Sequence, residues 1–213
     1  MKTSGRSYKI MNMSTLEIEV KFFLADMEVV RNQLKQFGAE SEGRVFETNI
    51  CFENAAQDLR VTKSLLRIRK DNQTTLTYKT KPDRPDNDFK VLTELEVAIS
   101  DFETMVDILK ALGYHQDQVY EKYRETFTLG STNVCLDSMP FGNFMEIEGQ
   151  KKDILQLARQ LDMPWQNRIL WNYRSMFFTL KERLNLGFND ITFNNFRDID
   201  LDIEPFLPAF EAG

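Results

Sequence analysis

Charged side chains recur two residues apart along this chain of 213 residues. The first group is Glu17-Ile18-Glu19-Val20-Lys21, and the later pairs are Arg67/Arg69, Lys79/Lys81, Glu94/Glu96, Lys122/Arg124 and Glu146/Glu148. A strand points successive side chains to opposite faces, so residues two apart share a face. These segments therefore predict strands with one apolar and one ionic face. Because both signs of charge repeat in this way, the ionic faces are predicted to line a cavity.

The residue types in these pairs suit two complementary ligands. Carboxylates that share a face supply the oxygen donors preferred by Mg²⁺ or Mn²⁺. Arg and Lys on facing strands suit a polyphosphate, because a guanidinium can bind two phosphate oxygens at once. A metal and a phosphate bound together would each relieve the repulsion among the other's ligands. The alternative for any single pair is a solvated strand face, where an ion pair contributes about 0–1 kcal/mol.

Hydrophobic periodicity and turn residues predict the strands and helices that carry these side chains. Strands are predicted at residues 16–24, 45–53, 65–70, 74–81, 91–99, 119–129, 133–137 and 143–148, and helices at residues 26–37, 100–112, 151–161 and 173–186. Ser100 and Glu103 form the expected capping box of the second helix. Strands in hairpin order with helices between them indicate an antiparallel α+β fold. We predict a closed or nearly closed eight-stranded antiparallel β-barrel with helices packed outside, because closure removes the sheet edges and turns one face inward.

The ordered set of segments resembles the CYTH, or triphosphate tunnel metalloenzyme, family. The family's ExExK signature is matched by Glu17, Glu19 and Lys21. The segments that follow in the family's order are Leu66-Arg67-Ile68-Arg69, Thr77-Tyr78-Lys79, Glu94-Leu95-Glu96, Lys122-Tyr123-Arg124, and Asp137 with Glu146-Ile147-Glu148. The resemblance covers about residues 16–161 and implies an eight-stranded tunnel that holds a triphosphate. The family includes class IV adenylate cyclases, thiamine triphosphatases and inorganic triphosphatases.

The resemblance also implies a role for each charged residue. It assigns the divalent metal, Mg²⁺ or Mn²⁺, to Glu17, Glu19, Glu96, Asp137, Glu146 and Glu148. It assigns the triphosphate to Lys21, Arg67, Arg69, Lys79, Lys81, Lys122 and Arg124. Lys21, Glu94 and Tyr173 are the implied catalytic residues, and Lys181 is expected to reach the tunnel from the last helix.

Two reactions fit these residues, and the overall layout of the segments resembles the class IV cyclase-like bacterial members of the family slightly more closely. In a triphosphatase, water attacks the terminal phosphorus of tripolyphosphate, thiamine triphosphate or a nucleoside triphosphate. In a class IV adenylate cyclase, the ribose 3′-hydroxyl of ATP attacks the α-phosphorus, giving cyclic AMP and pyrophosphate. The alternative to an enzyme is a polyphosphate- or nucleotide-binding module without catalysis, whose C-terminal tail docks a partner. A barrel with solvated ionic faces is the purely structural alternative.

Composition narrows the expected partners. The net charge is −6, but residues 187–213 hold six acids against Arg197, so residues 1–186 carry only −1. Without a basic excess, nucleic acid is not an expected partner. A membrane is not expected either, because no apolar run approaches the roughly 20 residues that span a bilayer. Cys51 and Cys135 are expected as reduced, buried thiols, which predicts a cytoplasmic protein.

The chain divides into three predicted parts. Residues 1–13 are expected to form a disordered leader, with Met11 or Met13 as an alternative start, and residues 14–186 the tunnel domain. Residues 187–213 form an acidic tail rich in Phe, for which disorder, packing across the barrel, and docking on a partner or on a second subunit of a homodimer are all left open. Trp165 and Trp171 precede the last helix. Anchoring that helix is their favoured role, and stacking on a base is the alternative.

Overall fold

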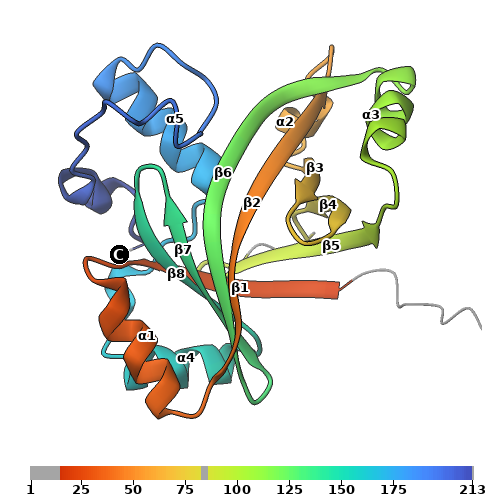
Figure 1. The fold of residues 1–213 in the computed structure, drawn as a ribbon. Coiled ribbons are helices and arrows are strands. Elements are labelled where there is room, and N and C mark those ends of the chain that lie inside the picture. Colours follow the sequence, from red (N-terminus) through yellow and green to blue (C-terminus); the bar gives the residue numbers. More distant parts are fainter. Residues whose placement is uncertain (1–14, 83–85, 213) are drawn as a thin grey trace, which may run out of the picture.

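Eight strands of the computed structural model, which describes residues 15–82 and 86–212, close into a barrel (Figure 1). They are β1 (Thr15–Phe23), β2 (Glu40–Asn54), β3 (Leu65–Lys70), β4 (Thr74–Thr80), β5 (Lys90–Ala98), β6 (Tyr114–Leu129), β7 (Thr132–Met139) and β8 (Gly142–Glu148). The order around the barrel is β1-β5-β4-β3-β2-β6-β7-β8, and every neighbouring pair is antiparallel. The predicted fold class is therefore confirmed. The predictions for residues 1–13 lie outside the described residues.

The helices lie outside the barrel (Figure 1). They are α1 (Met27–Gln36), α2 (Asp58–Val61), α3 (Phe102–Ala111), α4 (Lys151–Gln160) and α5 (Tyr173–Leu184), with the 3₁₀ turns η1 (Trp165–Asn167) and η2 (Glu204–Ala209). The predicted capping box is wrong, because Asp101 caps α3 and its carboxylate accepts the Thr104 N–H at 2.7 Å. The helix starts later than predicted, so Asp101 rather than Ser100 reaches the free amides of its first turn.

Strand alternation sends the ionic face of β1 into the barrel and its apolar face outward against helices. The outward side chains Val20 and Phe22 join a buried cluster with Leu34 of α1 and Leu157 of α4. A separate cluster around Ile68 packs α2 and α3 on the outside of β2 and β3. Because the apolar side chains of these strands pack against the outer helices, the charged side chains point into the barrel interior.

The C-terminal segment after α5 packs against the rest of the chain. Ile191, Phe196 and Phe210 are buried in one cluster with residues of α5 and β6. The Ile191 N–H donates to the Val119 carbonyl at 2.8 Å, and the Ala212 N–H donates to the Arg168 carbonyl at 2.8 Å. Of the alternatives left open for this segment, the structure shows packing within the chain.

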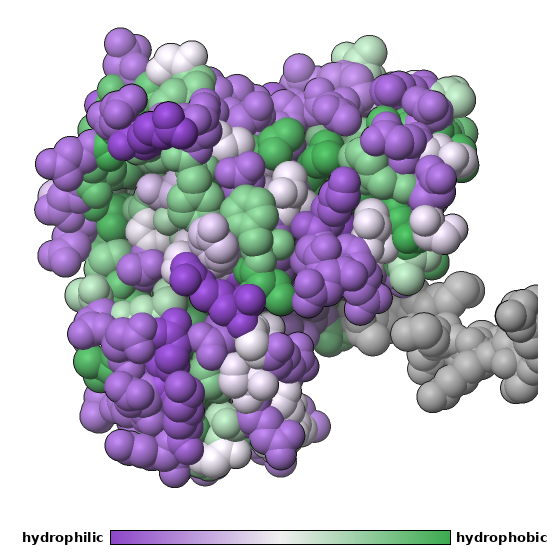
Figure 2. Space-filling model, viewed as in Figure 1, coloured by the Kyte–Doolittle hydropathy of each residue, from purple (hydrophilic) through white to green (hydrophobic). Residues whose placement is uncertain are grey.

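Polar and charged residues cover much of the face of the molecule that is viewed in Figure 2, and smaller apolar areas lie between them. Among residues 15–82 and 86–212, no helix combines the length and apolar character needed to cross a bilayer. Cys51 and Cys135 are buried and free, as predicted.

Candidate active site

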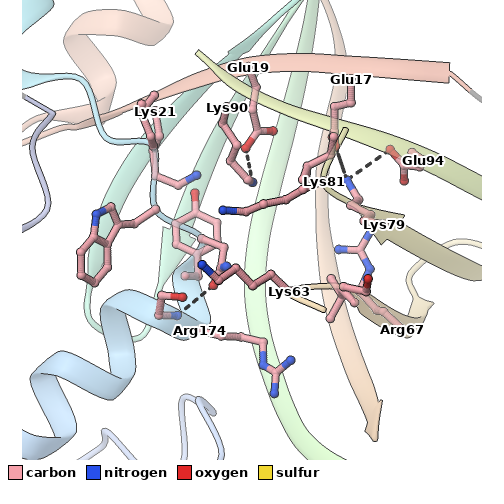
Figure 3. A pocket seen from close by; sticks show the side chains of 18 of the residues that line it. Glu17, Glu19, Lys21, Lys63, Arg67, Lys79, Lys81, Lys90, Glu94 and Arg174 are labelled. Atoms are coloured by element: carbon pink, nitrogen blue, oxygen red, sulfur yellow. Dashed lines mark hydrogen bonds and ion pairs between the residues drawn. The ribbon is translucent and has the colours of Figure 1, made fainter. Parts of the chain in front are cut away.

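A cavity of about 870 Å³ occupies the barrel interior (Figure 3). The predicted site residues that line it are Glu17, Glu19, Lys21, Arg67, Arg69, Lys79, Lys81, Glu94, Glu96, Lys122, Arg124, Glu146, Glu148 and Tyr173. The structure thus brings all the predicted site residues except Asp137 and Lys181 to the lining of one cavity. The roles assigned to them remain predictions.

Strand register explains why charges of opposite sign meet inside the barrel. Lys21 of β1 lies opposite Glu146 of β8, and its Nζ donates to Glu146 Oε1 at 2.5 Å. Lys79 of β4 lies opposite Glu94 of β5, with Nζ and Oε2 3.2 Å apart. Antiparallel pairing brings residues that share a face into direct opposition. The spacing of two therefore becomes rows of ion pairs around the tunnel.

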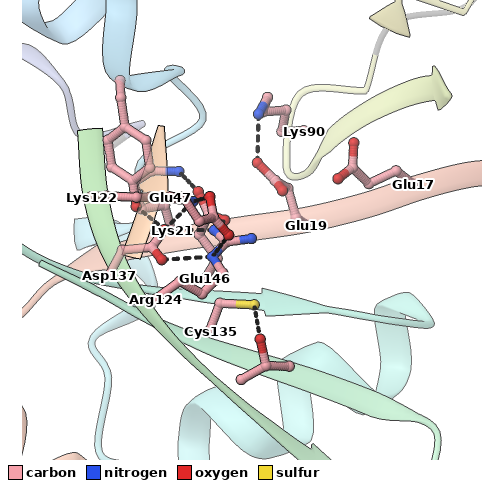
Figure 4. A network of polar contacts seen from close by, with 12 residues as sticks. Glu17, Glu19, Lys21, Glu47, Lys90, Lys122, Arg124, Cys135, Asp137 and Glu146 are labelled. Atoms are coloured by element: carbon pink, nitrogen blue, oxygen red, sulfur yellow. Dashed lines mark hydrogen bonds and ion pairs between the residues drawn. The ribbon is translucent and has the colours of Figure 1, made fainter. Parts of the chain in front are cut away.

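One network of polar contacts centres on Asp137, which is fully buried (Figure 4). Its carboxylate accepts from Lys122 Nζ at 3.0 Å, from Arg124 Nε at 2.7 Å and from the Tyr173 hydroxyl at 2.8 Å. Arg124 also contacts Glu146, which joins this network to Lys21. Both Asp137 oxygens are occupied and the residue does not line the cavity, so its placement favours support of Lys122 and Arg124 over direct metal ligation.

Tyr173 contacts both Asp137 and Lys21 in this network. Burial, followed by the negative charge of Asp137, raises the pKa of the Tyr173 hydroxyl well above its usual value, so the hydroxyl stays protonated. Lys21 Nζ lies 4.2 Å from the centre of the Tyr173 ring, within the range of a cation–π contact. These contacts orient Asp137 and Lys21. The expectation for Lys181 is wrong, because α5 turns its Nζ toward Asn189 at 3.5 Å and away from the cavity lining.

A second group of charges lies on β1, β4, β5 and β8. Lys79 Nζ donates to both Glu17 oxygens at 2.7 Å, and Lys90 Nζ donates to Glu19 Oε1 at 2.5 Å. Burial, with the charges of Glu17 and Glu19, raises the pKa of Glu148 to about 7. Burial and the charge of Glu19 also raise the pKa of Glu17. The carboxylates on this part of the wall therefore repel one another despite the nearby lysines.

The carboxylates in this second group of charges are oxygen donors, the type of ligand that a hard divalent cation prefers. Glu17, Glu19 and Glu148 supply only oxygen, and their mutual repulsion would be relieved by a bound Mg²⁺ or Mn²⁺. Within the described residues, no three Asp, Glu, His or Cys side chains are gathered as a metal site. Glu17 and Glu19 point to lysines instead. Glu17, Glu19 and Glu148 would hold the metal once the lysines release Glu17 and Glu19.

Arg67 is a cation in the cavity that forms no ion pair with any residue the structure describes. Its Nη1 donates to the Tyr120 hydroxyl at 2.7 Å, and its buried Nε has no hydrogen-bond partner. A buried N–H without an acceptor is unfavourable. The guanidinium is therefore ready to bind an anion, and phosphate oxygens match its geometry.

The sequence reasoning missed Lys90 and Glu47. Lys90 lines the cavity and has the same strand parity as Glu94 and Glu96, but the predicted strand began one residue after it. Glu47 is buried on β2, with Lys122 Nζ 3.6 Å away. Although burial opposes ionisation, Lys122 and Arg124 lower the pKa of Glu47 to about 2. No charged residue lies two positions before or after Glu47, so the spacing that marked the other site residues is absent there.

A second cavity, of about 330 Å³, opens at the other end of the barrel. It shares Arg69, Arg124 and Glu148 with the main cavity. Glu47 and Asp71 also line it. Arg69, Arg124 and Glu148 therefore lie between the two cavities.

The sequence comparison decides the family. The model of the CYTH domain matches residues 15–164, which include β1 to β8 and α4. The chain belongs to the CYTH family. A CYTH relative from Methanocaldococcus jannaschii, named "Putative adenylate cyclase", is 32% identical over 149 residues, covering 69% of this chain and 84% of the relative.

Solved structures share the CYTH barrel. A "putative adenylate cyclase" from Vibrio parahaemolyticus superposes with a TM-score of 0.69 at 18% identity, covering 76% of this chain and 98% of that one. A Hippeastrum protein, described as a "putative adenylyl cyclase" with "a dominant" triphosphatase activity, gives a TM-score of 0.57 at 17% identity, covering 76% and 95%. At these identities the likeness supports the fold alone.

Proposed function

We propose that this CYTH protein is a divalent-metal-dependent enzyme that cleaves a triphosphate bound inside the tunnel. The observation that carries the proposal is the charge of the cavity. Among the residues that the structure describes, eleven Lys and Arg line it against eight Asp and Glu, although the chain as a whole carries a net charge of −6. An enclosed excess of positive charge in an acidic protein suits a small polyanion.

Cations fixed around a triphosphate stabilise the negative charge that moves onto the leaving oxygens during phosphoryl transfer. Arg67 is available to bind phosphate as it stands, whereas Lys79 and Lys90 must first leave Glu17 and Glu19. A divalent cation, when bound, would withdraw charge from the phosphate and activate the nucleophile. The exchange of partners lets the lysines bind phosphate while Glu17 and Glu19 bind the cation.

Hydrolysis is the reaction that we favour. The second cavity shares Arg69, Arg124 and Glu148 with the main one, which supports an approach of water to a terminal phosphate from the side opposite the entering substrate. Cyclisation of ATP is the second candidate, supported by the name of the Methanocaldococcus jannaschii relative. The Hippeastrum protein is named a putative adenylyl cyclase and is described as having a dominant triphosphatase activity, so a cyclase name does not argue against hydrolysis.

Product identification tests the proposal. The protein is incubated with tripolyphosphate, ATP or thiamine triphosphate and with Mg²⁺ or Mn²⁺, and the products are resolved by ³¹P NMR and mass spectrometry. Metal-dependent release of orthophosphate is the expected result. Cyclic AMP and pyrophosphate from ATP would instead support the cyclase. Tight binding of all three compounds without any product would support a binding module and overturn the enzymatic proposal.

A further inference from the structure

We infer that Trp171 forms a stacking platform at the tunnel mouth for the flat organic group of an organic triphosphate; this inference rests on the proposed function. Trp171 lines the main cavity, yet its side chain remains 41% exposed. The sequence between η1 and α5 that carries it lies beyond residue 164, where the CYTH match ends. The platform would therefore be a feature of this chain's own C-terminal region.

The residues before and after Trp171 in the sequence are both held by hydrogen bonds. Ile169 exchanges two backbone hydrogen bonds with Lys21, at 2.7 and 3.1 Å, which ties this segment to β1. Asn172 caps α5, and its side-chain oxygen accepts the Ser175 N–H at 2.8 Å. Because the residues on both sides are anchored, Trp171 is held at the mouth in one place.

The C-terminal segment supports the indole ring from behind. The rings of Trp171 and Phe210 are 5.7 Å apart at an angle of 57°, and Phe210 is fully buried. Glu211 forms a backbone bridge with Ile169, so the support is connected to the strand that carries Lys21. The indole is thus packed against Phe210, while Trp171 stays partly exposed and lines the cavity.

The mixed lining of the cavity indicates what would cover this exposed ring. Charged side chains of the strands make up much of the lining, and Leu65, Leu170 and Phe178 are apolar residues that line the same cavity as Trp171. Lys63 and Lys81 extend into the cavity (Figure 3), and neither forms an ion pair among the described residues. A ligand that fits has a polyanionic end held deep in the tunnel and a flat apolar end at the mouth.

An organic triphosphate with a heteroaromatic group has this form. Stacking on an aromatic side chain contributes about 1–3 kcal/mol per base, which corresponds to roughly 5- to 150-fold in affinity. Bare tripolyphosphate has no group that could cover Trp171. The platform therefore predicts that the protein binds an organic triphosphate in preference to the inorganic one, and that Trp171 accounts for the difference.

Binding of two probes tests this inference without requiring turnover. Isothermal titration calorimetry with Mg²⁺ compares an imido-bridged ATP analogue with imido-bridged tripolyphosphate in wild-type protein, Trp171→Ala and Trp171→Phe. We expect Trp171→Ala to weaken binding of the ATP analogue about tenfold or more relative to the tripolyphosphate analogue, and Trp171→Phe to retain most of the preference. Equal weakening for both probes in Trp171→Ala would overturn the platform and leave the proposed function standing.

Fluorescence supplies a second readout. The chain has two tryptophans, and Trp165 packs against Phe22 and Phe89, so the matched variant Trp165→Phe leaves Trp171 as the single reporter. The ATP analogue should shift or quench Trp171 emission, and the tripolyphosphate analogue should do so much less. Identical spectra with both probes would contradict stacking. Wild-type protein that binds neither probe would overturn the proposed function together with the platform. Binding of both probes, with no product from ATP, tripolyphosphate or thiamine triphosphate, would contradict the enzymatic proposal alone.

Discussion

Lys21 and Glu146 lie directly opposite each other on β1 and β8, and Lys21 Nζ is 2.5 Å from Glu146 Oε1. Although burial opposes ionisation, Lys21 and Arg124 hold the pKa of Glu146 well below its usual value. Elsewhere in the tunnel, Glu19 is likewise paired with Lys90. Many of the tunnel charges are therefore paired with one another in this structure, and we expect a bound metal and a bound triphosphate each to replace one partner of these pairs.

Glu19 should be needed for metal-dependent turnover. Glu19→Ala removes one of the three glutamates that we expect to hold the cation and leaves Lys90 without its partner. We expect the metal-dependent rate to fall at least about 100-fold, while the circular dichroism spectrum is retained. Glu125→Gln is the matched control, because Glu125 is a buried carboxylate paired with Arg31 and does not line either cavity. Full turnover by Glu19→Ala would remove the carboxylate group from the mechanism.

Arg67 should contribute to substrate affinity more than to stability. Because it forms no ion pair among the described residues, Arg67→Gln removes a cation without leaving a buried carboxylate unpaired. We expect affinity for a triphosphate to fall about 10- to 100-fold, with little change in the melting temperature. Arg124→Gln provides the contrast, since it breaks contacts to Asp137 and Glu146 and should lower the melting temperature as well. Unchanged binding by Arg67→Gln would show that this face of β3 does not contact the ligand.

Glu148 should make the metal-free protein less stable as the pH rises. Its pKa is raised from 4.5 to about 7 in the folded state, so the folded protein binds more protons than the unfolded chain between these values. The free energy of unfolding should therefore fall as the pH rises from about 4.5 to 7. Urea denaturation in EDTA at several pH values measures this slope, and Glu148→Gln should make it shallower. A slope that Glu148→Gln leaves unaltered would show that another group causes it.

Asp137 should stabilise the fold whether or not metal is present. Asp137→Asn removes the charge that Lys122, Arg124 and Tyr173 share in a buried site. Breaking such a buried pair costs about 3–5 kcal/mol, so the midpoint of urea denaturation should fall equally in EDTA and in Mg²⁺. Titration with Mn²⁺ should show little change in metal affinity. Loss of Mn²⁺ binding with unchanged stability would instead make Asp137 a metal ligand.

Parts of this site could be predicted from the sequence because strand geometry is local. The spacing of Glu17, Glu19 and Lys21 places them on one face of any strand, and the apolar residues Ile18 and Val20 between them mark the opposite face. Both conclusions hold in the structure, where the charged face points into the barrel. The helix α2 has only four residues, too few for a hydrophobic period, so the sequence pattern did not predict it.

The amino-acid sequence by itself determined which side chains share a face, because the alternation of a strand is a property of neighbouring residues. Tertiary structure decided which faces meet: register placed Lys90 against Glu19 and buried Asp137 behind the wall. It also packed Phe210, far along the chain, beneath Trp171 at the mouth. Such pairings depend on barrel closure and on contacts between distant segments, which local spacing does not encode.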